Sequence, residues 1–445
     1  MTTSDEVWQG VTAAGPWWSS IPHPAFEPVG ADMTDADRAQ PVPSWRRQPG
    51  HLAWLDAELR RLLAFSPDPR HPEGGFAMLD GDGRPQLDAP VHTWITGRMT
   101  HVHALGHLRG LPGSGPLVDH GVAALTGLLR DEEHDGWFSS VSAAGEPDTT
   151  KDAYQHAFVV LGACSATAAG RPGADALLEA ALAVYDRFWD EDAGLFVESY
   201  DRAWQLAEPY RGANSNMHAV EACLAAGDAT GDPRWHDRAL RVAGFLIDEV
   251  TRAHGWRLVE HFDPAWQPVL EYHRDEPAHP FRPYGTTIGH WLEWARLLLQ
   301  LEASLPAPPA WLREAATELF TAATAVGWAA DGQPGFVYTL DWQDQPVVTS
   351  RMHWVICEAI AAAAVLHERT GEPDYEHWYR TFWDHAATAF IDRQRGSWHH
   401  ELDADLTPAT GTWAGKPDLY HAVQATLLPQ LDLAPALAAQ LSRPK

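Results

Sequence analysis

Six stretches of the chain share one order of hydrophobic and polar positions. Each begins with a helical segment whose apolar residues recur at 3.6-residue spacing, and continues with a glycine, an aromatic residue, a short strand-like segment and a polar turn. A second helical segment, apolar on nearly every side, completes the unit. The recurring glycines are Gly75, Gly136, Gly194, Gly255, Gly335 and Gly396, at intervals of 61, 58, 61, 80 and 61 residues. The pattern therefore predicts six repeated units.

The contrast between the two helices of a unit predicts how the units assemble. The second helix must be buried because it has no polar face, whereas the first can face solvent. One unit cannot cover its own apolar face, so six units are expected to close into an inner and an outer ring of helices. The alternative, an open α-solenoid, has units of only about 20 to 45 residues. We predict an all-α fold, an (α/α)6 barrel with short β-hairpins at the cavity rim, over residues 50–445, preceded by an irregular extension at 1–49.

Charge and composition narrow the function. The chain has 32 Lys and Arg against 60 Asp and Glu, a formal net charge of −28, which leaves no basic surface for nucleic acid. No apolar run reaches the roughly 20 residues that cross a bilayer, and the first residues do not look like a signal peptide. The three cysteines match no disulfide or metal spacing. We expect a soluble, cytoplasmic monomer or homodimer that acts on a small molecule and does not bind membranes.

The candidate chemistry lies at one rim of the predicted barrel. Each hairpin leads into a buried helix, so the N-terminal ends of six helices gather there, where the helix dipoles favour negative charge. The residues at these positions are Arg98, His101, His103, Tyr154, His156, Asn214, His218, His290, Glu293, His353, Trp354, Tyr420 and His421, and the hairpins add His399, His400 and Glu401. For His101, His103, His353 and His421, an ordinary core or surface role is at least as good an interpretation.

Spacing favours proton transfer over metal binding. His290 and Glu293 are three residues apart, so they share a helix face, and a carboxylate there can orient an imidazole. No HExxH motif occurs, and His101 and His103 would project from different faces of a helix. The sequence therefore predicts no metal site.

Several phrases resemble a known family. RPYGTTIGHWLEWARLLLQL, GANSNMHAVEACLAA, TWITGRMTHVHAL, KDAYQHAF, RMHWVICEA and GSWHHELD are similar to the N-acylglucosamine 2-epimerase superfamily, in particular its branch of mannose and sulfoquinovose isomerases. The resemblance covers about residues 50–435 and implies an (α/α)6 barrel that works without a metal or other cofactor. It further implies that His290 and His400 are the acid/base pair and that Glu293 positions His290. Because His399 and His400 are adjacent in the motif, His399 is the alternative to His400 in this pair. The residues implied for the sugar pocket are Arg98, Tyr154, Asn214, His218, Trp354 and, more weakly, Arg282.

The expected reaction is aldose–ketose isomerisation through a cis-enediol, which needs a base whose pKa lies near neutrality. By the resemblance, the substrates would be D-mannose and D-fructose, with D-lyxose and D-xylulose as a second pair. The alternatives are a sugar 2-epimerase of the cellobiose or N-acylglucosamine type and a sulfoquinovose isomerase. An inverting glycoside hydrolase on a similar barrel would instead need two carboxylates about 6.5 to 9.5 Å apart. A sugar-binding barrel without catalysis is the last possibility.

Overall fold

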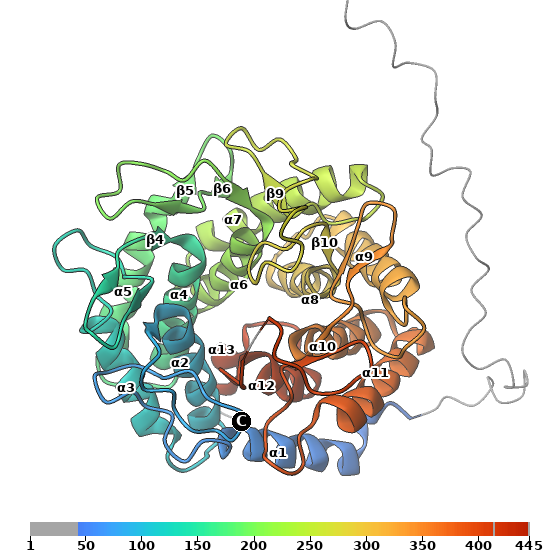
Figure 1. Cartoon of the computed structure of the whole chain (residues 1–445), viewed down its shortest axis with the longest axis horizontal. Helices are drawn as coiled ribbons and strands as arrows, with labels where there is room; N and C mark the ends of the chain where they lie inside the picture. Colours follow the sequence, from blue (N-terminus) through green and yellow to red (C-terminus); the bar gives the residue numbers. More distant parts are fainter. Residues whose placement is uncertain (1–42, 413, 444–445) are drawn as a thin grey trace, which may run out of the picture. The chain divides into compact units, whose positions relative to one another are not determined.

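The computed structural model describes residues 43–412 and 414–443, and its helices form two concentric rings (Figure 1). The inner ring consists of α2 (Thr93–Leu108), α4 (Ala153–Ala168), α6 (Ala213–Thr230), α8 (Ile288–Ser304), α10 (His353–Thr370) and α12 (Tyr420–Leu427). The outer ring consists of α1 (Pro49–Leu63), α3 (Ser114–Thr126), α5 (Ala174–Tyr185), α7 (Arg234–Ala243), α9 (Trp311–Gly327) and α11 (Pro373–His385). The short helix α13 (Leu437–Leu441) follows. One compact unit, Trp45–Lys445, contains all of them, and most of the predicted N-terminal extension lies outside the described residues.

Helix contacts close the ring. Each inner helix packs on the outer helix that follows it in sequence, from α2 on α3 to α10 on α11. The last inner helix, α12, packs on the first outer helix, α1, and also contacts α2. The predicted (α/α)6 barrel is therefore confirmed, and the open solenoid is wrong.

Burial follows the hydrophobic pattern of the two helix types. In α8 every residue from Ile288 to Glu302 is buried, whereas α1 buries only one face, formed by Leu55, Glu58, Leu59 and Leu62. Inner helices approach closely where glycine replaces a side chain. A Cβ atom on Gly97 of α2 would lie 2.4 Å from the carbonyl oxygen of Phe158 in α4. This contact of two backbones brings the rim residues of α2 and α4 next to each other.

Short strands connect neighbouring units at the rim. The strands are β1 (Val91–His92), β2 (Ser140–Val141), β3 (Pro147–Asp148), β4 (Lys151–Asp152), β5 (Trp189–Asp190), β6 (Leu195–Phe196), β7 (Ser199–Tyr200), β8 (Arg211–Gly212), β9 (His261–Phe262), β10 (Thr286–Thr287), β11 (Thr339–Leu340), β12 (Pro346–Val348), β13 (Arg351–Met352) and β14 (Glu401–Leu402). The strand before each of the first five inner helices pairs antiparallel with the next unit's hairpin: β1 with β2, β4 with β7, β8 with β9, β10 with β11 and β13 with β14. Before α12, the backbone N–H of Lys416 donates to the carbonyl of Leu79 at 3.0 Å, which links the sixth unit to the first.

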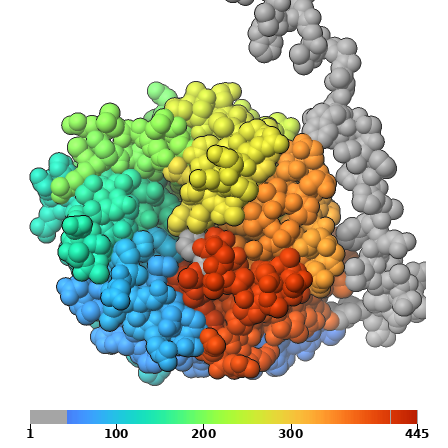
Figure 2. Space-filling view, in the orientation of Figure 1, coloured from blue at the N-terminus to red at the C-terminus, as the bar shows by residue number. Residues whose placement is uncertain are grey.

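The long loop of the fourth unit reaches over the barrel opening. Residues 263–285 connect β9 to β10, and in the space-filling view this yellow segment lies beside the red segment of the sixth unit (Figure 2). Within the part of the chain that the structure describes, no helix has the length and apolar character that a membrane span requires.

Candidate active site

A cavity of about 80 Å³ lies at the N-terminal ends of the inner helices. All six inner helices contribute side chains, and four connecting segments complete the walls. The lining residues are Trp94, Arg98, Tyr154, Asn214, His218, Pro280, Phe281, Pro283, His290, Glu293, Tyr338, His353, Trp354, His400, Pro417, Asp418 and His421. Of the predicted site residues, Arg282 is absent from these walls. The other eight lie together in one cavity, at the rim where the sequence pattern places them.

His290 has a different carboxylate partner from the one expected. Its Nδ1–H donates to Glu260, with both carboxylate oxygens at 3.0 Å. The same Glu260 accepts the backbone N–H of Thr287, at 3.1 Å, and so fixes the start of α8. Glu293 instead accepts from Arg296 at 3.2 Å, one turn deeper in the barrel. The prediction that Glu293 holds His290 is therefore wrong: a shared helix face does not decide which way the carboxylate turns.

The partner on Nδ1 fixes the chemistry of His290. Because a carboxylate can only accept, Nδ1 carries the proton and the lone pair of the neutral ring is on Nε2. The ring of Trp354 lies 5.2 Å from the His290 ring. Gly289 makes this approach possible, since a Cβ atom there would come within 2.2 Å of the Trp354 ring. The GH of the GHWLEW phrase thus supplies both an imidazole with an available Nε2 lone pair and the space for its aromatic neighbour.

His400 stacks on a second histidine. The rings of His400 and His353 lie 3.7 Å apart at 23°. Burial, followed by the nearby His353 and Lys416, holds the pKa of His400 well below its usual range. Burial also lowers the pKa of His353 to about 4, so both rings are neutral at pH 7. His399 lies outside the cavity, near Asp392 at 3.8 Å, and the choice between the adjacent histidines therefore falls on His400.

Arg98 supplies the positive charge of the cavity. Its guanidinium donates to the hydroxyl of Tyr154 at 3.0 Å and to the carboxylate of Asp418 at 3.2 Å. It also lies over the rings of Trp94, Phe158 and Tyr420, at 4.8, 4.3 and 4.6 Å from their centroids. Burial opposes the charge, but Tyr154 and Asp418 outweigh it and raise the pKa of Arg98. The guanidinium is therefore held charged and in a fixed orientation.

Beneath the cavity lies a buried charged cluster, formed by Arg296, Glu293, Glu358 and Glu221, which we call the floor. Arg296 donates to Glu358 at 2.9 Å as well as to Glu293. Glu358 in turn accepts the Nδ1–H of His421 at 2.8 Å, and Glu221 lies 3.4 Å from Nδ1 of His218. Burial and the neighbouring Glu358 raise the pKa of Glu293 well above its ordinary value, and Arg296 opposes that rise. The floor thus orients two further histidines of the cavity.

Two groups of potential metal ligands belong to this floor. They are His218, Glu221 and Glu293, and Glu293, Glu358 and His421. In both, the guanidinium of Arg296 already provides a cation beside the carboxylates. A third group lies on the long loop and is described below.

Sequence reasoning missed Glu260, Trp94, Tyr338, Phe281 and Asp418. A signal for Glu260 exists: aligning the hairpins places it with Glu198 and Glu401, each four or five residues after the unit's glycine. Glu198 accepts from Ser215 at the start of α6, as Glu260 does at the start of α8. A glutamate that anchors the next inner helix is therefore a recurring device of the hairpins. In the fourth unit this glutamate, Glu260, also has a histidine, His290, within hydrogen-bond distance.

Arg282 has a structural role that differs from the predicted one. Its guanidinium donates to the two carboxylate oxygens of Glu208 at 2.6 and 3.0 Å and lies 3.9 Å from the ring centroid of Tyr210. These contacts turn its side chain toward the hairpin of the third unit and away from the cavity. Its neighbours Phe281 and Pro283 line the cavity instead.

Comparison with known proteins agrees with this architecture. D-mannose isomerase from Thermobifida fusca is 61% identical over 401 residues, which cover 89% of this chain and 98% of the relative. D-mannose isomerase from Pseudomonas cannabina pv. alisalensis is 51% identical over 404 residues, covering 90% and 97%. A crystal structure of a D-mannose isomerase matches with a TM-score of 0.80 at 27% identity, over 87% of this chain and 99% of that one.

The family model of N-acylglucosamine 2-epimerase (GlcNAc 2-epimerase) matches residues 74–425. The match extends from the hairpin of the first unit into α12 and so includes every lining residue of the cavity. The chain belongs to the N-acylglucosamine 2-epimerase family.

Proposed function

We propose that this protein is an isomerase that interconverts D-mannose and D-fructose by proton transfer between histidines and the sugar. The observation that carries the proposal is that His290 and His400 line one small cavity together with a fixed arginine, Arg98. The names of the relatives at 61% and 51% identity support the choice of sugar. D-lyxose, which has the same configuration at C2 and C3, is the expected second substrate.

In the proposed reaction each group has its own role. His290 removes the proton from C2 through Nε2, since its Nδ1–H is bound to Glu260. The C2–H bond breaks, a cis-enediol forms, and the same ring returns the proton to C1. His400, a neutral ring, accepts the O2 proton and supplies the proton that O1 takes up. The aldehyde at C1 thereby becomes an alcohol and the alcohol at C2 a ketone, with no net gain or loss of protons.

Arg98 and the wall of aromatic rings assist this reaction. Negative charge develops on O1 and O2 as the enediol forms, and a positive group that is already oriented stabilises it without reorganising. Arg98 meets this condition because Asp418 and Tyr154 hold it. Trp354 and Trp94 offer apolar faces on which a sugar ring stacks.

The cavity argues against two of the alternatives. Among its described lining residues Arg98 is the one lysine or arginine, and it is paired with Asp418, so no second cation is available for a sulfonate. The acids of the same walls are Glu293 and Asp418, and an arginine holds each of them. A glycoside hydrolase needs one carboxylic acid and one carboxylate that act directly on the substrate.

Proton NMR of D-mannose in deuterated water tests the proposal. We expect D-fructose to accumulate with deuterium at C1 whenever the abstracted proton exchanges with solvent. Formation of D-glucose without fructose would assign the protein to the 2-epimerases. Neither product, together with no exchange at C2, would contradict the proposal.

Replacing Glu260 by glutamine should separate the positioning of the His290 ring from the binding of the sugar. The amide of Glu260→Gln can donate to Nδ1 and stabilise the tautomer whose Nε2 carries the proton, which cannot act as a base. We expect kcat to fall by about 10²- to 10⁴-fold, the effect of losing a positioned base to the wrong tautomer, with little change in KM. Glu260→Asp should recover part of the loss.

Glu198→Gln is the matched control, because Glu198 has the equivalent place in the third unit and contacts Ser215. The dependence of kcat on pH should change for Glu260→Gln and stay that of the wild type for Glu198→Gln. Equal kcat values for the wild type, Glu260→Gln and Glu198→Gln would show that Glu260 does not position the base.

A further inference from the structure

Phe281 lies where a bound sugar would leave the cavity. Its side chain is 41% exposed, whereas His290 and His400 deeper in the cavity are 9% and 6% exposed. The ring lies 6.4 Å from that of Trp94 and 6.1 Å from that of Tyr154, edge-on to both. Phe281 comes from the loop of the fourth unit, while Trp94 and Tyr154 come from α2 and α4. The aromatic ring therefore reaches across the opening to the opposite wall.

Contacts of its neighbour Arg282 hold Phe281 in this place. The side chain of Arg282 binds Glu208 through two hydrogen bonds, lies 3.6 Å from Glu198 and stacks on Tyr210. A charged pair with two hydrogen bonds fixes orientation as well as distance. The residue next to Phe281 is thus anchored to the hairpins of the third unit.

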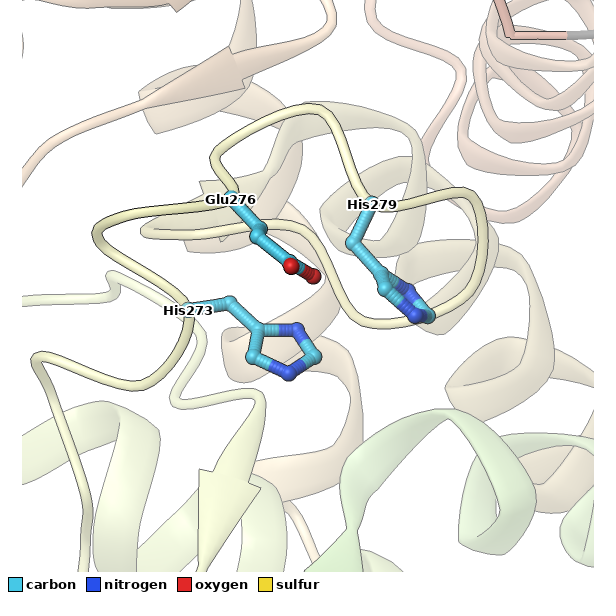
Figure 3. A group of neighbouring side chains, drawn as sticks. All are labelled: His273, Glu276 and His279. Carbon is cyan, nitrogen blue, oxygen red and sulfur yellow. The ribbon is translucent and has the colours of Figure 1, made fainter.

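Two histidines of the loop, His273 and His279 (Figure 3), hold the backbone of Phe281 and Arg282. His273 donates its Nδ1–H to the carbonyl of Arg282 at 2.8 Å. Nδ1 of His279 accepts the backbone N–H of Arg282 at 3.1 Å and that of Phe281 at 3.3 Å. The segment that carries Phe281 is therefore held through its side chain and through its backbone.

The same histidines, with Glu276, form the third group whose ligand atoms could hold a metal ion. In His279 the Nδ1 atom accepts amide protons, so the proton of the neutral ring is on Nε2 and neither nitrogen offers a free lone pair. In His273 the Nδ1–H is bound to a carbonyl. The hydrogen bonds of both histidines are those of residues that hold the loop backbone. A metal ion bound to Nδ1 of His279 would have to displace the amide protons that this atom accepts.

We propose that Phe281 determines the size of the substrate and limits the cavity to monosaccharides. This inference rests on the proposed function, in which C1 and C2 lie at His290 and His400. The far end of the sugar, C4 to C6, then points toward the opening, where the Phe281 ring occupies the position of a glycosidic substituent. The small cavity volume, about 80 Å³, agrees with a site closed over a single sugar ring.

Phe281→Ala tests this inference with 4-O-β-D-mannopyranosyl-D-mannose, whose reducing end is identical to D-mannose. We expect the wild type to convert D-mannose and to leave the disaccharide almost unchanged. In Phe281→Ala the ratio of kcat/KM for the disaccharide to that for D-mannose should rise at least about 10-fold, the range that one steric contact in a pocket provides. Phe281→Leu should give an intermediate ratio.

Leu206→Ala is the control, since Leu206 is also an apolar loop residue, is 71% exposed and lies outside the cavity. Thermal denaturation of all variants checks that each is folded. An unchanged ratio in a folded Phe281→Ala, or a wild type that converts the disaccharide as well as D-mannose, would overturn the inference. A wild type inactive on D-mannose would instead contradict the proposed function itself.

Discussion

Replacing His290 with alanine should lower kcat for D-mannose by about 10²- to 10⁴-fold, the usual contribution of a positioned general base. His290→Ala removes the Nε2 lone pair that takes the C2 proton, but it leaves Arg98, Tyr154 and Trp354 in place to hold the sugar. KM should therefore change far less than kcat. Exchange at C2 in deuterated water should be lost together with product formation.

His400→Ala should lower kcat by a similar factor while keeping a detectable exchange at C2, because this ring moves protons between oxygens. The adjacent His399 provides a matched control. It is the next residue in sequence, it lies near Asp392, and it does not line the cavity. His399→Ala should keep kcat within a few-fold of the wild type. An inactive His399→Ala variant beside a His400→Ala variant that keeps wild-type kcat would show that the two histidines have been assigned in the wrong order.

The fold could be predicted because the signal for it repeats along the whole chain. Every unit carries the same change from an amphipathic helix to one that is apolar on all sides, and a single physical rule applies to all of them. The location of the site follows from the same repeat. Tyr154 and His290, 136 residues apart in the sequence, both begin inner helices and so reach one cavity.

The partners within the site could not be predicted, since they depend on the relative placement of segments with no fixed spacing. The pairing of β8 with β9 places the backbone of Glu260 beside the start of α6, and its side chain then reaches Thr287 and His290 at the start of α8. Arg282 turns away from the cavity because Glu208, 74 residues earlier, is the carboxylate that it meets. The His353–His400 stack joins two units in the same way. Helical periodicity contains none of this information.

The floor of the cavity should be the most sensitive point for stability. Arg296 is 1% exposed and is the cation shared by Glu293 and Glu358, which are equally buried. Removing one partner of a buried ion pair typically costs about 3 to 5 kcal/mol, because the other charge is left without compensation. We expect Arg296→Met to lower the free energy of unfolding by an amount in this range.

The pH dependence of that loss has a definite sign. Burial raises the pKa of Glu293 and of Glu358, and the guanidinium of Arg296 opposes that rise. Without the Arg296 guanidinium, both carboxyl groups should stay protonated in the folded protein up to a higher pH. In the unfolded chain they ionise above about pH 4.3. A raised folded pKa favours the folded state at low pH and loses that advantage as the pH rises toward the folded pKa. The deficit of Arg296→Met relative to the wild type should therefore be larger at pH 8 than at pH 5.5.

Urea unfolding of the full chain at the two pH values measures this difference. Arg313→Met is the control: Arg313 also binds a glutamate, Glu302, but its side chain is 44% exposed, so its loss should cost less than about 1 kcal/mol at either pH. Adding Glu358→Gln to Arg296→Met removes one uncompensated carboxylate and should restore part of the stability. If the double variant is no more stable than Arg296→Met and the deficit is equal at both pH values, the lost stability comes from packing, and the floor is not held by charge.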